Sequence, residues 1–112
     1  VHANGEYTLG ENIADQGGLR IAYTAWKENC PAAADPSGQF TPDQLFYLAY
    51  AGVWASNIRP EEILLRTQSD PHSLGRNRVN VTLRNIDPFF KAFGISESEP
   101  MFRPEKERVV IW

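Results

Sequence analysis

A capped and almost wholly apolar segment near the middle of the chain constrains the fold most. Thr41-Pro42-Asp43-Gln44 is a strong helix start, because Thr41 can cap the helix, Pro42 fits its first position and Gln44 completes a capping box. From Leu45 to Ala55 the residues are apolar or small nearly all round, which predicts a helix buried on most sides. The segment is too short to span a bilayer, which needs about 20 residues. It therefore predicts the core helix of a folded domain.

Length and composition are those of one ordinary globular domain, residues 1–112. The 112 residues suffice for a hydrophobic core, and 42% of them are hydrophobic against 22% charged. The net charge of −3 provides no basic patch, so nucleic acid is not an expected partner. Cys30 is the only cysteine; it cannot form an internal disulfide, and without a His or Cys at metal-ligand spacing it is expected to be a passive thiol.

The first helix is expected to begin at Glu11 or Asn12 and to end at about Asn29, after an extended lead-in over residues 1–9. Gly17 and Gly18 interrupt it, each at a cost of about 1 kcal/mol relative to Ala. Close approach of another backbone and a simple kink explain this glycine pair equally well. The candidate core positions of this helix are Ile13, Ile21, Ala22, Ala25 and Trp26.

The remaining segments follow turn chemistry and hydrophobic spacing. Residues 31–40 read as a loop, residues 60–69 as a short helix and residues 85–93 as a final helix. Strict alternation of Val79, Val81 and Leu83 with polar residues over 78–84 predicts an extended segment with one buried face. In the final helix and beyond it, we expect Phe89, Phe90 and Phe93 to be core anchors, Gly94 to be the C-terminal cap, and the apolar end Val109-Val110-Ile111-Trp112 to pack.

Two carboxylates lie four residues apart in the string Gly10-Glu11-Asn12-Ile13-Ala14-Asp15-Gln16-Gly17-Gly18-Leu19. At that spacing Glu11 and Asp15 share one helix face and repel each other by roughly a few tenths of a kcal/mol. The helix dipole favours acids in a first turn, which explains Glu11 better than Asp15. A cation, or a group bound to a cation, facing both carboxylates is the alternative explanation. The pattern alone leaves both interpretations open.

The same string closely resembles the third-ligand helix of the neprilysin and endothelin-converting-enzyme family of zinc metallopeptidases. The resemblance implies that Glu11 is a zinc ligand and that Asp15, one turn further on, orients a zinc-bound His. Carboxylates commonly accept the second ring N–H of a ligating His. The family's His-Glu-x-x-His motif, which supplies two His ligands and the general base, does not occur in these residues.

Two later blocks are similar to the same family. Asp70-x-His72-Ser73, with Arg78 six residues after His72, resembles a pattern in which the His stabilises the oxyanion, the Arg hydrogen-bonds the substrate carbonyl and the Asp holds the His. A fixed donor at a developing oxyanion is worth about 3 kcal/mol. Without the resemblance, His72 is a surface His in a loop and Arg78 lies on the polar face of the extended segment.

The resemblance also implies that Val53 and Trp54 line the pocket for the substrate residue after the cleaved bond, although burial alone explains an apolar pair. The chain departs from the family in two places. Many members end in Cys-x-x-Trp with that Cys in a disulfide, whereas this chain has Val109-Val110-Ile111-Trp112, and Leu74 replaces a commoner proline. The first departure favours a bacterial, envelope-located relative over an animal ectodomain.

The sequence therefore predicts a mainly α fold: the helical C-terminal portion of a gluzincin-type metallopeptidase catalytic domain, with one short extended segment. The parent would bind one Zn²⁺ and cleave peptides on the amino side of hydrophobic residues, in the periplasm, in the cell envelope or as a secreted enzyme. This segment would contact peptide substrates and the upstream half of the same polypeptide, and no membrane. With one zinc ligand, it should hold zinc weakly or not at all and be inactive alone.

The alternative interpretation is a non-catalytic helical interaction module derived from the same fold. If the chain is instead a fragment, the face around Gly17, Gly18 and Trp54 should carry an exposed apolar patch where the domain contact is missing.

Overall fold

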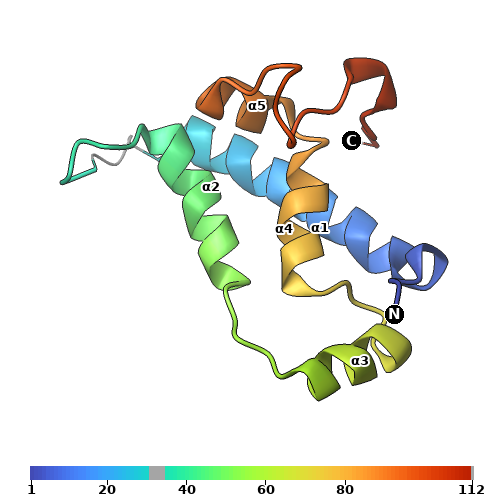
Figure 1. The fold of residues 1–112 in the computed structure, drawn as a ribbon. Helices are drawn as coiled ribbons and strands as arrows, with labels where there is room; N and C mark the ends of the chain where they lie inside the picture. Colours follow the sequence, from blue (N-terminus) through green and yellow to red (C-terminus); the bar gives the residue numbers. More distant parts are fainter. Residues whose placement is uncertain (31–34, 112) are drawn as a thin grey trace.

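The computed structural model describes residues 1–30 and 35–111, and this part of the chain is helical without a strand (Figure 1). This confirms the mainly α fold. Within the described residues the elements are α1 (Gly5–Asn29), α2 (Pro42–Val53), α3 (Pro60–Ser69), α4 (Gly75–Leu83), α5 (Asp87–Phe93) and the 3₁₀ turn η1 (Glu105–Glu107).

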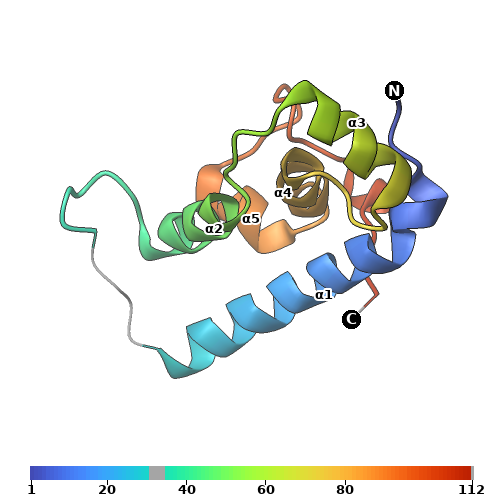
Figure 2. The ribbon, with the colours of Figure 1, turned by 90° about the horizontal axis from the view of Figure 1, so that it is seen from below.

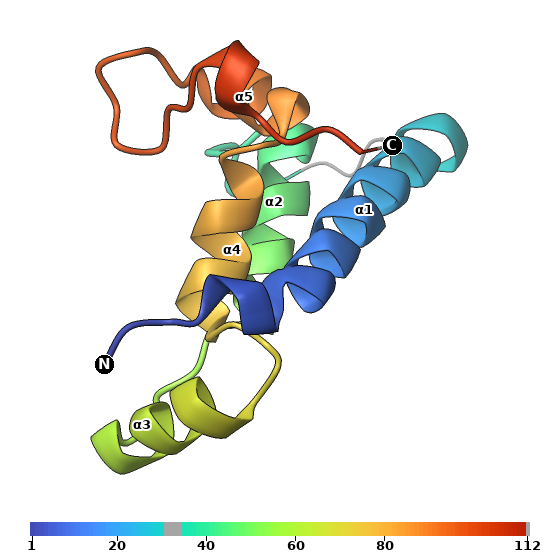
Figure 3. The same cartoon turned by 90° about the vertical axis from the view of Figure 1, so that its right-hand side faces the viewer.

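The helices form a bundle with one outlying member. The long α1 runs along one side, with α2 and α4 beside it, and α5 lies at one end while α3 lies at the opposite end (Figures 1 and 3). Seen from below, α4 lies between α1 and α3 (Figure 2). The main helix pairs are α1 with α4 and α2 with α5. In the described part of the chain, no helix is both long and apolar enough to cross a membrane.

The first helix begins earlier than expected, so the extended lead-in over residues 1–9 is wrong. The side chain of Asn4 accepts a hydrogen bond from the backbone N–H of Tyr7 at 3.1 Å and caps α1. Asn is a preferred N-cap residue, and this cap lets the helix begin at Gly5 instead of at Glu11 or Asn12. Because α1 begins at Gly5, Glu11 lies beyond its first turn.

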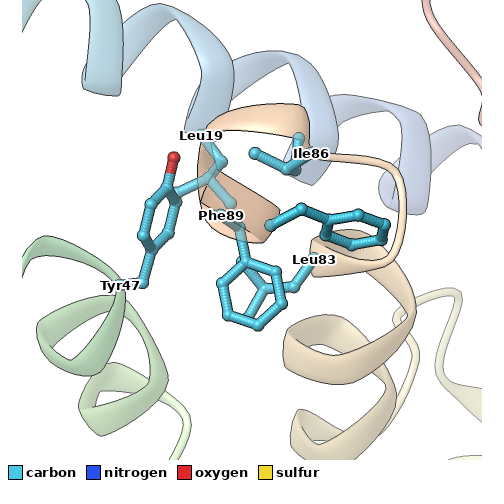
Figure 4. Close-up of a cluster of buried hydrophobic side chains, with 6 residues drawn as sticks. Leu19, Tyr47, Leu83, Ile86 and Phe89 are labelled. Carbon is cyan, nitrogen blue, oxygen red and sulfur yellow. The ribbon is translucent and has the colours of Figure 1, made fainter. Parts of the chain in front are cut away.

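The core lies where the second half of α1 meets α2, α4 and α5. Figure 4 shows its buried side chains, among which Tyr47 and Ile86 are each only 1% exposed. Aromatic rings extend this core: Tyr47 and Phe89 meet edge to face with centroids 5.6 Å apart. The buried hydrophobic residues are Leu19, Tyr47, Leu83, Ile86, Phe89 and Phe90, with Phe93 partly buried against them.

The expected inward face of α1 is largely wrong. Ile21 is 64% exposed, Ala22 and Ala25 are exposed, and only Ile13 and Trp26 of that set are partly buried. The inward face instead buries Leu19 in the second half of the helix, and it buries polar residues, Thr8 and Gln16, nearer the N-terminus. Gly17 is buried and Gly18 is exposed, where an added Cβ would meet no atom within 4 Å. Apolar residues on the outward face misled the assignment, because the described chain leaves them exposed.

The expectation that α2 is buried on most sides is likewise wrong within residues 1–30 and 35–111. Its capping box forms as expected, with Thr41 and Gln44 bonded reciprocally. Tyr47 is buried, but Leu48 and Val53 are 41% and 71% exposed. An apolar pattern all round a helix indicates that cover is needed, without indicating which part of a protein supplies it.

Residues 78–83 lie in α4 and Arg84 is its C-cap, so the expected short extended segment is wrong. Val79 and Leu83, four residues apart, both face the core, while Val81 is 43% exposed. In seven residues with period-two alternation, polar side chains also recur at a spacing of four, as Arg78 and Thr82 do. A helix therefore fits the same pattern, and in it Arg78 faces α1. Tertiary packing decides between the two patterns.

The remaining predicted segments are confirmed in part. Helix α3 is confirmed with its expected bounds, and α5 is confirmed with Gly94 as its left-handed cap at φ 61°. Residues 31–34 of the expected loop and Trp112 lie outside the described residues. The apolar tail is not held by apolar packing, because Val109, Val110 and Ile111 are 46%, 58% and 49% exposed.

Candidate functional site

The candidate residues named from the sequence converge on one end of the α1–α4 pair. Glu11 and Asp15 come from α1, His72 comes from the loop between α3 and α4, and Arg78 comes from the first half of α4. Trp54, the C-cap of α2, completes the group. These segments lie far apart in the sequence, so their meeting is a property of the fold.

Asp15 and Arg78 form a two-point ion pair. Arg78 Nε and Nη2 donate to the two carboxylate oxygens of Asp15 at 2.6 and 2.7 Å. The side chain of Asp15 is 14% exposed and that of Arg78 is 15% exposed, so solvent screens the pair weakly. The hydrogen bonds that Arg78 donates to the Asp15 carboxylate raise the pKa of Arg78. Each Asp15 oxygen keeps a further lone pair, which leaves capacity for another donor.

Arg78 is also held from its other sides. Its guanidinium lies 3.7 Å from the ring centroid of Trp54, a cation–π stack. The backbone carbonyl of Arg78 accepts a 2.9 Å hydrogen bond from the hydroxyl of Tyr50. Gly75 lets α4 begin against α2, because a Cβ there would lie 2.7 Å from the carbonyl oxygen of Trp54. The guanidinium is thus fixed in direction before any ligand binds.

His72 bridges the two acidic groups that flank it. Its backbone N–H donates to Asp70 Oδ1 at 2.9 Å, and its ring Nδ1 lies 2.7 Å from the same oxygen. Its ring Nε2 lies 3.2 Å from Oε2 of Glu11. The backbone and side-chain hydrogen bonds from His72 lower the pKa of Asp70. This loop therefore faces the N-terminal half of α1, which carries Glu11.

A cavity of about 280 Å³ opens beside these groups. Its wall combines the apolar end of α2 with the polar loop and the start of α4. Among the residues that line it are Val53, Trp54, Asp70, His72, Leu74 and Arg78.

The geometry settles the meaning of the carboxylate pair in part. Since Glu11 lies beyond the first turn of α1, the helix dipole does not account for it. Asp15 has a cationic partner, although within the described chain this is Arg78. Sequence reasoning missed Tyr50 and Gly75, which hold Arg78 and Trp54 in place. The spacing of the aromatic residues in α2 could have pointed to Tyr50. Nothing in the sequence indicates the contact between Gly75 and Trp54.

The described residues offer only part of a metal site. Within residues 1–30 and 35–111, no group of three or more His, Cys, Asp or Glu side chains is arranged to hold a metal ion. A catalytic zinc ion takes three protein ligands and an open position. Glu11 offers a carboxylate oxygen of the type that zinc accepts, so the described residues fit a partial contribution to such a site.

Comparison with known proteins gives a consistent result. The family model of Peptidase family M13 matches residues 1–109. Neprilysin-21 of Caenorhabditis elegans is 39% identical over 96% of this chain and 15% of its own length. Human endothelin-converting enzyme 1 is 42% identical over 92% of this chain, and human neprilysin is 41% identical over 95%; each is covered over 14% of its length.

A solved structure shows the same fold. The Mycobacterium tuberculosis zinc metalloprotease Zmp1, in complex with an inhibitor, superimposes with a TM-score of 0.91 at 37% identity. The match covers 99% of this chain and 17% of the Zmp1 chain. The chain thus spans about a sixth of the relatives that it matches.

Proposed function

Since this chain belongs to peptidase family M13, we propose that it is the C-terminal part of the catalytic domain of a neprilysin-like zinc endopeptidase. The observation that carries the proposal is the convergence of three side chains from separate segments: His72 and Arg78 line one cavity, and Glu11 contacts His72 at 3.2 Å. In this proposal the chain supplies one zinc ligand and the donors that stabilise the transition state.

Glu11 is the proposed third zinc ligand. Its carboxylate faces the His72 loop and lies one helical turn from Asp15 on the same face of α1. A bound catalytic zinc ion supplies a Lewis acid and lowers the pKa of the water that it holds. Asp15 would use its remaining lone pairs to orient a ligating His from another part of the protein.

His72 and Arg78 are the proposed catalytic donors to the substrate. Asp70 fixes the orientation of the His72 ring through the 2.7 Å contact at Nδ1, which leaves Nε2 directed toward Glu11. Arg78 is fixed by Asp15 and Trp54. Donors held in advance at the place where negative charge develops need no reorganisation during the reaction, and removal of one typically costs about 10²–10³-fold in kcat.

The cavity beside the donors is the proposed pocket for the substrate residue after the cleaved bond. Val53 and Trp54 give it an apolar wall, and Val53 is 71% exposed in this chain. An apolar wall at that position would favour cleavage on the amino side of hydrophobic residues, with peptides as the substrate class.

Exposed apolar residues support a larger parent. They include Ile21 on the outward face of α1 and Leu64 and Leu65 on α3, at 64%, 43% and 57% exposed. Patches of this kind mark interaction sites, and we assign them to the upstream part of the same polypeptide, which would also bring the remaining zinc ligands. From the family resemblance we propose that this parent acts outside the cytoplasm, in the periplasm, in the cell envelope or as a secreted enzyme.

The test compares Glu11→Gln with Glu6→Gln in the full-length protein. Glu6 lies on the same helix in its first turn and is exposed, so it is the matched control. A neutral amide is a poor zinc ligand, so Glu11→Gln should lose zinc, peptide turnover or both, and Glu6→Gln should keep them. Zinc content by atomic absorption and hydrolysis of a fluorogenic peptide give the result. Near-wild-type values for Glu11→Gln would overturn the ligand assignment.

A further inference from the structure

A buried ring of hydrogen bonds lies directly behind the site. Asn85 Nδ2 donates to Gln16 Oε1 at 3.2 Å, Gln16 Nε2 donates to the carbonyl of Val109, and the N–H of Val109 donates to Asn85 Oδ1 at 3.0 Å. Asn85 and Gln16 are 5% and 7% exposed. The three partners therefore close a cycle between α1, the end of α4 and the C-terminal segment.

The position of the ring connects it to the site. Gln16 follows Asp15 directly in α1, and Asn85 follows the last turn of α4, seven residues after Arg78. Asn85 Nδ2 also lies 3.4 Å from the carbonyl oxygen of Val81, so its side chain packs against the last turn of α4. The helices α1 and α4 are therefore joined by two polar links, the ion pair inside the site and the amide ring behind it.

The C-terminal segment holds the ring from outside. Arg103 Nη1 donates to Asn85 Oδ1 at 2.8 Å, and the backbone carbonyl of Arg103 accepts from Arg108 Nε at 2.8 Å. Arg108 in turn pairs with Asp87 at 2.8 Å and lies 4.2 Å from the ring centroid of Phe90. Since Val109, Val110 and Ile111 are about half exposed, these polar contacts anchor the tail, together with Phe102, which packs against the core.

We propose that Asn85 is a positioning residue for the site. Together with Gln16 and the main chain of Val109, it fixes where α4 crosses α1. That crossing aligns Arg78 with Asp15. A fully satisfied buried polar network specifies one geometry, and the loss of one member leaves the others unpaired in a low-dielectric interior. The inference rests on the proposed function, because it needs Arg78 to act on the substrate.

The test is a double-mutant cycle in the full-length enzyme, with Asn85→Ala and Asp15→Asn separately and together. Asn85→Ala should lower kcat/KM about tenfold at unchanged zinc content, because small misplacements of a positioning group cost up to about 10²-fold. In the Asp15→Asn background the same change should cost less than about twofold, since residues of one network are not additive. A residue with only a structural role would lower kcat/KM by the same factor in both backgrounds.

Gln44→Ala is the matched control, because Gln44 also joins two elements, donating to the carbonyl of Ala92 at 2.9 Å away from the site. It should lower the unfolding temperature and leave kcat/KM within about twofold of wild type, as expected for a distant and independent position. If Asn85→Ala does not fold, Gln16→Met, which keeps the chain length and removes the ring's hydrogen bonds from α1, takes its place under the same criteria.

The two proposals fail in distinguishable ways. Wild-type kcat/KM for Asp15→Asn would contradict the proposed site and the inference with it. An impaired Asp15→Asn, combined with wild-type activity of Asn85→Ala or with equal losses in both backgrounds, would overturn the inference alone.

Discussion

The two ends of this bundle are built in opposite ways. At the α5 end, Tyr47, Ile86 and Phe89 are 7% exposed or less and the aromatic rings pack against one another. At the α3 end, the described chain buries none of the α3 residues, and Leu64 and Leu65 remain open to solvent. The helices α1 and α4 run from one end to the other and share both environments.

This difference explains why the site lies where it does. The closed end provides a rigid support from within the chain itself, whereas the open end presents Glu11, His72 and the cavity wall to whatever completes them. Under the proposed function, the polar and apolar side chains exposed together at this end would contact the rest of the parent. The described chain thus combines a packed core at one end with an open candidate site toward the other.

Truncation in the closed end should have the largest effect on stability. Phe89→Ala removes a ring that is 7% exposed and packs on Tyr47, so it should lower the free energy of unfolding by about 3–5 kcal/mol. The same truncation at the open end, Leu65→Ala, should cost less than about 1 kcal/mol because Leu65 is 57% exposed. Urea unfolding of the 112-residue chain measures both, and equal costs would break the comparison.

An intermediate effect is expected where the two ends meet. Arg78→Lys keeps the positive charge but loses the two-point contact with Asp15 and the stack on Trp54. We expect a loss of roughly 1–3 kcal/mol in unfolding free energy, the range for hydrogen bonds to charged groups. Arg66→Lys, at an exposed pair with Glu62, is the control and should change stability little. Equal losses for the two variants would contradict a special role of the Arg78 geometry.

The dependence on pH sharpens the comparison at the open end. Hydrogen bonds from His72 lower the pKa of Asp70 below its ordinary value of 3.8. Its contribution to stability is therefore complete above that ordinary value and is lost as the pH falls through the lower folded value. A carboxyl-carbon NMR titration should show Asp70 titrating below pH 3.8, and Asp70→Asn should remove this part of the acid dependence. An ordinary titration would show that the loop is not held as described.

The smallest effect in this chain should come from its uncovered surface. Leu65→Ser should change the unfolding free energy of the isolated chain by less than about 0.5 kcal/mol, because surface substitutions rarely exceed that. In the full-length protein the same change should cost about 1–3 kcal/mol if the side chain is covered there. Thermal unfolding of both forms decides the matter, and equal small shifts would place the missing contact elsewhere.

The candidate site residues could be named from local sequence strings, whereas the packing of the helices could not be predicted as well. Glu11, Asp15, His72 and Arg78 belong to local strings with recognisable spacing, and the fold brings those strings together. The inward face of α1 was misassigned because Ile21 and Ala25 are apolar yet exposed, whereas Thr8 and Gln16 are buried with polar bonds. The apolar character of a side chain indicates that it tends to be buried, and it does not indicate which part of a protein buries it.

The segment 78–84 shows a second limit. Seven residues with alternating polarity satisfy strand and helix patterns alike, and here contacts of Arg78 with Asp15 and of Leu83 with the core select the helix. The amide ring of Gln16, Asn85 and Val109 had no local signal, because its members are distant in sequence and two of its bonds use the main chain of Val109. Such networks become visible only after the helices are placed.

Zinc titration of the isolated chain tests the central claim, that it contains half of a site, most directly. The purified 112-residue chain, shown to be helical by circular dichroism, would be titrated with zinc in a calorimeter and assayed with a fluorogenic peptide in added zinc. A single carboxylate ligand should not compete with water for the ion, so we predict no stoichiometric binding at micromolar zinc and no hydrolysis. Tight one-to-one binding with chelator-sensitive hydrolysis would mean that this chain holds a complete site and would contradict the account.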